Sequence, residues 1–254
     1  MKLLIASALL LAAPALPPAA APIPATPREV ERDVPYVPTP EPVVRAMLEL
    51  AGVGKADFHV DLGCGDGRIA VAAARDFGAR SLGVEIDPKR IGEARRLAER
   101  EGVADRAEFR RADLFGTDLT GATVVTLYLL PAVNMRLRPA MLALKPGARV
   151  VSHDFDMGDW PPDRSVRLPD EGSTVYLWIV PANVAGRWRV TGPGGAVSEV
   201  RLEQRFQRLS GDVRDGRVAG DRVSFTLPDG RRLAGRAAGE AMEGEGWRAE
   251  RVGD

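Results

Sequence analysis

A glycine-rich loop between a strand and a helix limits what this chain can fold into more than any other feature. The loop lies in residues 61–70, which read DLGCGDGRIA. Apolar residues alternate from Phe58 to Leu62, as in a β-strand, and recur with helical spacing from Ile69 to Phe77. Glycines at every second position let the backbone turn sharply and approach a ligand closely. Since the following helix points its first N–H groups at the same place, the loop predicts a site for a nucleotide-type cofactor.

The spacing of the glycines distinguishes between two kinds of cofactor. The dinucleotide fingerprint needs a small residue three positions after its second glycine, and that position here holds Arg68. An NAD-dependent oxidoreductase is therefore disfavoured. The loop also carries Asp61 and Asp66, which would repel a pyrophosphate but suit a cofactor with positive charge. For this segment alone, a tight glycine turn with solvated acids is the alternative.

Acidic residues also stand at the ends of the next two predicted strands. Residues 81–87 read as a strand with Glu85 near its end, and residues 107–112 as a strand followed by Asp113. Pro88 would open the helix between them. An acid about 20 residues beyond a glycine turn can accept hydrogen bonds from both hydroxyls of a ribose. Acids at successive strand ends therefore favour a nucleoside-binding site.

The loop and these acids resemble the motifs of the class I methyltransferases, which bind S-adenosylmethionine (SAM). Within that class, residues 34–181 resemble small lysine methyltransferases of the ATP-synthase c-subunit type and their bacterial relatives. Residues 34–40 (VPYVPTP) and 61–68 (DLGCGDGR) carry this resemblance. It implies an α/β fold with a Rossmann-like doubly wound sheet. It also implies a SAM-dependent methyltransferase whose acceptor is a protein side chain, lysine among them, or a small molecule.

The resemblance also implies which residues bind the cofactor. The loop would hold the methionine end of SAM, Glu85 the ribose, Ile86 the adenine face, and Asp113 with Leu114 the adenine edge. The segment before the first helix would close over SAM. The complete predicted set is Tyr36, Thr39, Asp61, Gly63, Gly65, Asp66, Gly67, Glu85, Ile86, Asp113 and Leu114. For Tyr36, simple packing of the linker is the alternative.

No catalytic residue stands out, and His153 and Tyr128 are the weak candidates. His153 lies near the end of a strand predicted at residues 148–155, and Tyr128 near the end of one predicted at 123–130. A lysine acceptor is almost wholly charged at neutral pH, so a site must desolvate or deprotonate it. His153 is the histidine placed to help, and ordinary hydrogen bonding at a strand end is its alternative role. His59, inside the first strand, is expected to be a hydrogen-bonded core residue.

Three further side chains would shape the acceptor mouth, namely Asp154, Asp156 and Trp160. A polar surface loop around one packed indole is the alternative. Residues up to Pro169 are expected to be irregular, before a last strand at 174–180. Nearer the N-terminus, Thr39 is expected to cap a helix that begins at Pro40.

Composition and motifs exclude several classes of protein. The 35 basic and 35 acidic residues form no basic stripe, and no Asn/Asp-Pro-Pro-aromatic element follows the fourth strand, so no nucleic-acid partner is expected. No group of acids, histidines and cysteines has metal-ligand spacing, so no metal is expected. Cys64 is the one cysteine, which excludes an internal disulfide framework. We expect Cys64 to pack as a small apolar side chain.

The first 21 residues are typical of a secretory signal peptide. A basic residue, Lys2, precedes an apolar run at 3–13, and small residues follow at 19–21. Prolines in this stretch argue against a stable membrane span. With a Pro-rich linker at 22–35, the signal predicts an exported, periplasmic protein, and an uncleaved membrane anchor is the alternative. Export conflicts with the supply of SAM, which is made in the cytoplasm.

The sequence pattern changes after the predicted methyltransferase domain at 36–182, from alternating strands and helices to short strands. Residues 183–254 hold short alternating segments separated by turn signals such as Pro228-Asp229-Gly230. They predict a small antiparallel β-meander domain, or alternatively an extension of the first domain's surface. The predicted meander also allows an alternative function. The chain would then be a non-catalytic SAM- or nucleoside-binding module whose meander contacts a partner in the cell envelope.

Overall fold

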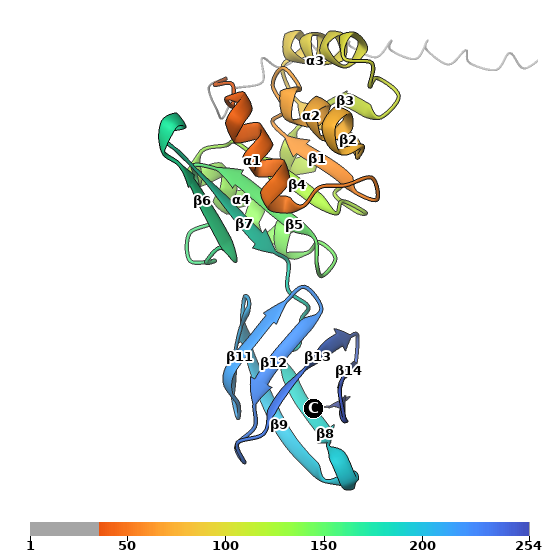
Figure 1. Ribbon diagram of the computed structural model, residues 1–254, viewed down its shortest axis with the longest axis vertical. Coiled ribbons are helices and arrows are strands. Elements are labelled where there is room, and N and C mark those ends of the chain that lie inside the picture. The colour runs from red at the N-terminus through yellow and green to blue at the C-terminus, as the bar shows by residue number, and fades with distance from the viewer. Residues whose placement is uncertain (1–35, 254) are drawn as a thin grey trace, which may run out of the picture. The chain divides into compact units, whose positions relative to one another are not determined.

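The computed structural model describes residues 36–253. The signal peptide and linker predicted at 1–35 lie outside the described residues. The first part of the described chain alternates strands and helices (Figure 1). In order these are α1 (Glu41–Ala51), β1 (Phe58–Leu62), α2 (Arg68–Phe77), β2 (Arg80–Glu85), α3 (Pro88–Arg100), β3 (Ala107–Arg111), η1 (Leu114–Gly116), β4 (Val124–Leu127), α4 (Pro131–Leu142), β5 (Arg149–His153), β6 (Arg164–Leu168), η2 (Pro169–Glu171) and β7 (Ser173–Ile179).

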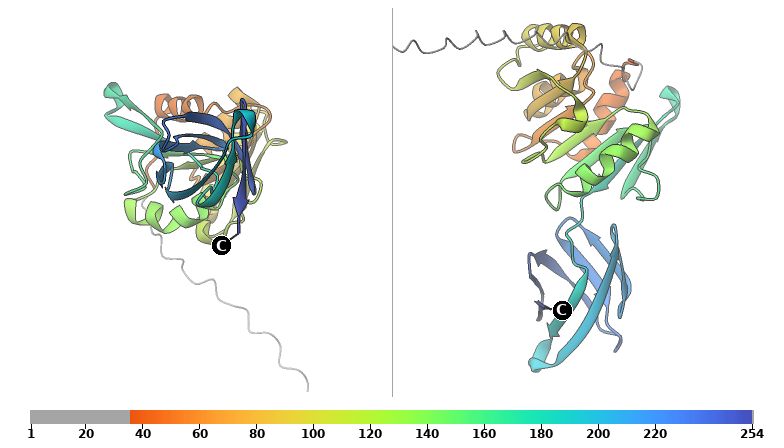
Figure 2. Two further views of the ribbon diagram at one scale, coloured as in Figure 1. Left: turned by 90° about the horizontal axis from the view of Figure 1, so that it is seen from below. Right: turned by 180° about the vertical axis from the view of Figure 1, so that it is seen from behind.

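These strands form one seven-stranded sheet in the order β3-β2-β1-β4-β5-β7-β6. The strands β1 to β5 are parallel, whereas β7 runs antiparallel to both β5 and β6. Helices α1 and α2 pack on one face and α4 on the other, as the two views from opposite sides show (Figures 1 and 2). The predicted Rossmann-like doubly wound sheet is therefore confirmed. Its interior strand β1 is buried on both faces, as is typical of such sheets.

The expectation that the segment before Pro169 is irregular was wrong, because β6 lies there. All but the last of its five residues are exposed, so no apolar alternation signals this edge strand. One helix start also differs from expectation. Helix α1 has Pro40 at its N-cap and no side-chain cap; the Thr39 hydroxyl lies instead 3.3 Å from His153 Nδ1. Helix α4 begins at Pro131, whose fixed φ suits the first turn of a helix.

The C-terminal part is a closed eight-stranded antiparallel barrel. Its strands are β8 (Gly186–Thr191), β9 (Val197–Arg205), β10 (Arg208–Gly211), β11 (Arg214–Ala219), β12 (Arg222–Thr226), β13 (Arg232–Ala238), β14 (Ala241–Gly244) and β15 (Trp247–Val252). Each strand follows its neighbour as in the predicted meander, but β15 also pairs with β8. The open meander is therefore wrong. The alternating residues of these strands all point to one core, which contains Trp188, Phe225 and Trp247, and closure completes the hydrogen bonding of both end strands.

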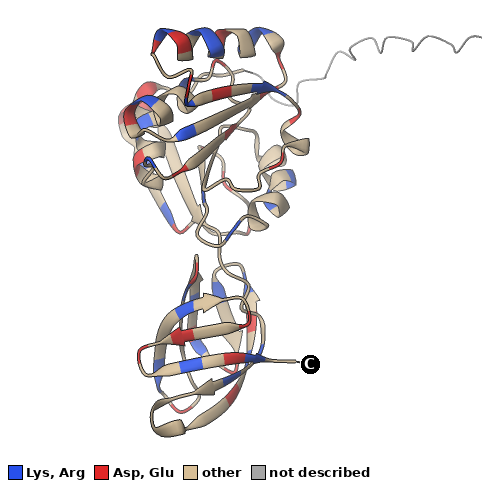
Figure 3. Cartoon of the chain, turned by 90° about the vertical axis from the view of Figure 1, so that its right-hand side faces the viewer, with Lys and Arg blue, Asp and Glu red and all other residues tan. Residues whose placement is uncertain are grey.

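Within residues 36–253, no helix combines the length and the apolar character needed to cross a bilayer. Basic and acidic residues are interspersed along the elements of this region (Figure 3).

We predict that Gly83→Ala destabilises the protein, because β2 passes too close to its neighbours at this point. A Cβ atom there would lie 2.6 Å from Phe109 Cδ1 and 2.7 Å from Cys64 Sγ. Such overpacking costs about 1–3 kcal/mol. The free energy of unfolding from urea titration measures it. The control is Gly92→Ala in α3, where the nearest atom is 3.5 Å away, and we expect that variant to gain roughly 0.4–1 kcal/mol. Equal stabilities for the two variants would contradict this account.

Candidate functional site

The carboxyl ends of the parallel strands bring together the residues that the sequence singles out. Asp61 and Glu85 lie at the ends of β1 and β2, and Asp113 follows β3. Tyr128 directly follows β4, and His153 is the last residue of β5. Because these strands run parallel, all five residues lie along one edge of the sheet, which we call the carboxyl edge.

Three glycines in left-handed conformations form the loop after β1. Gly63, Gly65 and Gly67 have φ values of 73°, 52° and 83°, a region that side chains rarely adopt. Close packing adds a second constraint. A Cβ atom on Gly65 would lie 2.6 Å from Tyr36 Cε2, and one on Gly67 would lie 2.7 Å from Ala94 Cβ. The alternation of glycine in the sequence therefore reflects both backbone geometry and lack of space.

Asp61 is a buried acid with one unsatisfied oxygen. Its Oδ1 accepts a 2.7 Å hydrogen bond from the Thr126 hydroxyl, whereas its Oδ2 is buried and has no partner. Burial, with added repulsion from Asp66 and Glu85, raises the pKa of Asp61 to about 7. An unpaired carboxylate oxygen in such surroundings favours binding of a cation.

Glu85 ties the glycine loop to the end of β2. Its carboxylate accepts hydrogen bonds from the backbone N–H groups of Gly65 (3.1 Å), Ile86 (2.7 Å) and Asp87 (2.9 Å). Two carboxylate oxygens offer about four acceptor sites, so capacity for a ligand hydroxyl remains. The binding of ribose by Glu85 stays a prediction.

A strap formed by residues 36–40 crosses the loop. The Arg68 guanidinium donates to both oxygens of Asp66, at 3.0 Å and 2.6 Å, and to the Thr39 carbonyl at 2.9 Å. Burial opposes ionisation of Asp66, but these bonds to Arg68 prevail and lower its pKa. The Tyr36 ring stacks beneath the Arg90 guanidinium, 3.6 Å from it. Sequence reasoning missed both arginines, since nothing local indicates that they reach the strap.

The predicted adenine-binding residues lie at the ends of β2 and β3. Ile86 and Leu114 are half-buried, and Asp113 is exposed. Asp113 Oδ1 accepts from the Phe115 N–H at 2.9 Å, which caps the short helix η1. Their contacts with adenine stay predictions.

His153 is buried with both ring nitrogens engaged by the protein. Nδ1 lies 3.3 Å from the Thr39 hydroxyl, and Nε2 lies 3.0 Å from the Ser173 hydroxyl. Burial lowers the pKa of His153, against the opposing charge of Asp154. The half-buried Tyr128 ring stacks on the imidazole, with 3.8 Å between centroids. His153 is therefore placed to support Tyr128, which is half-buried at the carboxyl edge.

One acidic residue, Asp154, lies beside this aromatic pair. Asp154 adopts a left-handed conformation with φ 59°, which Asp tolerates better than most residues. Its Oδ1 accepts from the Thr174 N–H at 2.8 Å. Asp156 follows on the same loop, and Asp170 and Glu171 lie in η2 beside Ser173. Trp160 is fully buried and packs on Trp178, so this indole is packed as in the alternative, whereas a role for Asp154 and Asp156 at the acceptor mouth stays a prediction.

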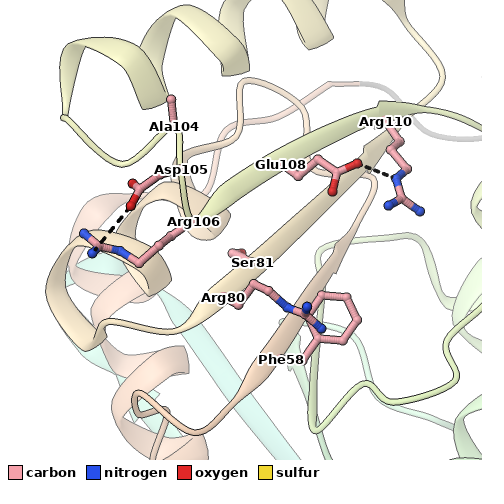
Figure 4. A pocket seen from close by; sticks show the side chains of 8 residues that line it. All are labelled: Phe58, Arg80, Ser81, Ala104, Asp105, Arg106, Glu108 and Arg110. Carbon is pink, nitrogen blue, oxygen red and sulfur yellow. Dashed lines mark hydrogen bonds and ion pairs between the residues drawn. The ribbon is translucent and has the colours of Figure 1, made fainter.

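A cavity of about 310 Å³ lies at the opposite edge of the sheet (Figure 4). Phe58 and Arg80, which begin β1 and β2, line it. Its two carboxylates are already paired, Glu108 with Arg110 at 2.7 Å and Asp105 with Arg106 at 4.0 Å. It is separate from the carboxyl edge.

Comparisons with known proteins agree with this geometry. The family described as ANTKMT methyltransferase domain matches residues 61–164. A protein-lysine N-methyltransferase of Saccharolobus islandicus is 48% identical over 151 residues, which cover 58% of this chain and 94% of that protein. The adenine nucleotide translocase lysine N-methyltransferase of Mus musculus is 39% identical over 155 residues, which cover 60% of this chain and 65% of that protein.

A crystal structure described as an RNA methyltransferase from Salinibacter ruber, in complex with S-adenosyl-L-homocysteine, is also similar. It is 58% identical, with a TM-score of 0.56, over 58% of this chain and 96% of that chain. The predicted cofactor is thereby confirmed as SAM. The chain belongs to the class I SAM-dependent methyltransferases, in the family of the ANTKMT and ATP-synthase c-subunit lysine methyltransferases.

Proposed function

We propose that this SAM-dependent methyltransferase methylates lysine side chains of a protein. The observation that carries the proposal is the 48% identity with a protein-lysine N-methyltransferase, of which this chain covers 94%. Membership in a family of methyltransferases also disfavours the alternative of a non-catalytic binding module.

The described residues fit SAM at the carboxyl edge. The unpaired oxygen of Asp61 suits the ammonium group of the cofactor's methionine end, and the glycine loop brings backbone without side chains to the same end of β1. When bound, SAM supplies a methyl group that its sulfonium already activates for in-line transfer. The protein's part is to exclude water and align the acceptor, which contributes about 7–11 kcal/mol in well-oriented reactions.

The surroundings of Tyr128 fit the lysine side chain. The rings of Tyr128 and Phe155 lie nearly parallel, with 6.3 Å between centroids, and offer apolar surface to the methylene stem. Asp154 lies beside them and raises the pKa of the Tyr128 phenol, after the larger effect of burial. Its charge would attract the lysine ammonium, and desolvation near the rings favours loss of the lysine proton before transfer.

RNA is a second candidate acceptor, because the Salinibacter ruber structure at 58% identity is described as an RNA methyltransferase. Charge argues against it. Residues 36–181 contain 21 acidic and 19 basic residues, and Asp154 carries its charge beside Tyr128. Phosphate groups would be repelled there.

The acceptor can be identified with methyl-labelled SAM and the purified full chain. A lysate of the source cells is divided, and one half is treated with ribonuclease and the other with protease before the reaction. We expect label in protein and, after hydrolysis, in methylated lysine. Label that survives protease and disappears with ribonuclease would show that RNA is the acceptor and overturn the proposal.

We also propose that the mature protein acts outside the cytoplasm, supported by the signal-like residues 1–21. The intact mass of the chain purified from its own cells tests this proposal. Loss of about the first 21 residues is expected. The full mass in a cytoplasmic fraction would contradict export, and the full mass in a membrane fraction would indicate the uncleaved anchor.

We predict that Asp154→Asn raises the KM for a lysine-containing protein acceptor about 3–10-fold, because a partly exposed charge near the acceptor is lost. Asn tolerates the left-handed conformation of this residue, so the fold should persist. The Kd for SAM should not change. The control Asp105→Asn removes a charge at the opposite edge of the sheet and should leave KM unchanged. Equal KM values for the two variants would argue against an acidic acceptor site.

We predict that Gly65→Ala weakens SAM binding at least tenfold, because the new methyl group would displace Tyr36 from the loop. Calorimetry with SAM measures the change. The matched control is Gly102→Ala. Gly102 also has a positive φ, 68° against 52°, but no atom lies within 4 Å of its Cβ position. Both variants therefore carry backbone strain, and only Gly65→Ala meets the strap. Equal losses would show that strain alone is responsible.

A further inference from the structure

Four polar side chains form a buried chain of hydrogen bonds across β2, β1 and β4, which we call the relay. Its members are Ser81, His59, Thr126 and Asp61. Ser81 lies opposite His59 in the β1–β2 pairing, and Thr126 lies opposite Asp61 in the β1–β4 pairing. Because His59 and Asp61 are two residues apart on one strand, their side chains share a face of the sheet. All four residues are at most 2% exposed.

The bond from Thr126 to Asp61 implies a direction for the other hydrogen bonds in the relay. The Thr126 hydroxyl has one proton, which it donates to Asp61 Oδ1 at 2.7 Å. It must therefore accept from His59 Nε2, 2.8 Å away. His59 Nδ1 then accepts from the Ser81 hydroxyl at 2.7 Å. His59 is neutral in this arrangement, and burial lowers its pKa to about 3, so the pattern persists at physiological pH.

A second Thr–Asp pair, which directly precedes the same two strands, shows what is special about this one. At the other end of β4, the Thr123 hydroxyl donates to Asp57 Oδ1, also at 2.7 Å. Asp57 additionally accepts from the Gly54 N–H at 2.8 Å and pairs with the Arg149 guanidinium. Asp57 is thus supplied with a cation by the protein, whereas Asp61 keeps one oxygen buried and free.

We propose that Ser81, His59 and Thr126 are positioning residues for cofactor binding. They hold one oxygen of the Asp61 carboxylate so that the other meets the ammonium group of SAM. The cofactor then provides the cation that Arg149 provides for Asp57. This assignment concerns the cofactor alone and does not depend on the identity of the methyl acceptor.

The proposal implies that protons are released when SAM binds. The charged groups that act on Asp61 are Asp66 and Glu85, and both are acidic, so without SAM the carboxyl holds its proton up to unusually high pH. An ammonium ion beside it favours the ionised form. SAM should therefore bind more tightly as pH rises from 6 to 7.5, before the ammonium of SAM itself begins to lose its proton.

The test compares three variants of the full chain by calorimetry with SAM between pH 6 and 7.5. Thr126→Val removes the donor to Asp61 and should weaken binding roughly tenfold or more and move the midpoint of the pH dependence upward. Thr126→Ser keeps the hydroxyl and should restore both values. Thr123→Val is the matched control, because it removes the other 2.7 Å Thr–Asp bond and should change neither.

Two outcomes would overturn the proposal. If Thr126→Val lowers the melting temperature but leaves the Kd and its pH midpoint as in Thr123→Val, the relay is only structural. If Thr126→Val does not fold, the unmodified protein decides the question, through calorimetry at pH 6.5 in two buffers of different ionisation enthalpy. Proton release on SAM binding is expected there, and its absence would refute the role of Asp61. A protein that binds SAM in this way but methylates no lysine would refute only the proposed acceptor.

Discussion

The structure depends on a carboxyl group buried at the centre of the sheet without a basic partner. An isolated charge in such a place costs several kcal/mol, and the protein reduces this cost in two ways. The Asp61 carboxyl keeps its proton up to a pH of about 7, and His59, two residues earlier, stays neutral down to about 3. Both groups therefore favour their uncharged forms, and β1 carries little net charge through the interior.

The two groups affect stability in opposite directions as pH changes. The pKa of Asp61 is higher in the folded than in the unfolded chain, so its contribution to stability is complete below about pH 4 and is lost as pH rises through about 7. The pKa of His59 is lower in the folded chain, so its contribution is present above about 6.5 and is lost as pH falls towards 3. Between about pH 4 and 6.5, each state carries one proton on these two groups. In the folded chain the proton is on Asp61, and in the unfolded chain it is on His59.

Local sequence signals predicted which acids and glycines meet at the carboxyl edge. Glycine spacing, strand alternation and strand-end acids all act within a few residues, so they survive in the sequence and correctly placed Asp61, Gly65 and Glu85 on one edge. Contacts between distant segments could not be found in this way. Thr39 meets His153 rather than capping its own helix, and Arg68 secures the strap to the loop. The burial of His153 likewise depends on Ser173 from a strand that is antiparallel to its own.

The barrel shows the same limit on a larger scale. The sequence indicated its strands but not that the first would pair with the last. As a consequence of that pairing, the barrel has no unpaired outer strand on which another polypeptide could extend the sheet. A partner of the barrel would meet its side chains and loops, and arginine is frequent among the side chains that face outward, with Arg187 directly opposite Arg201 and Arg222 directly opposite Arg236. Such recognition would rest on Coulomb attraction, and dissolved electrolyte would weaken it.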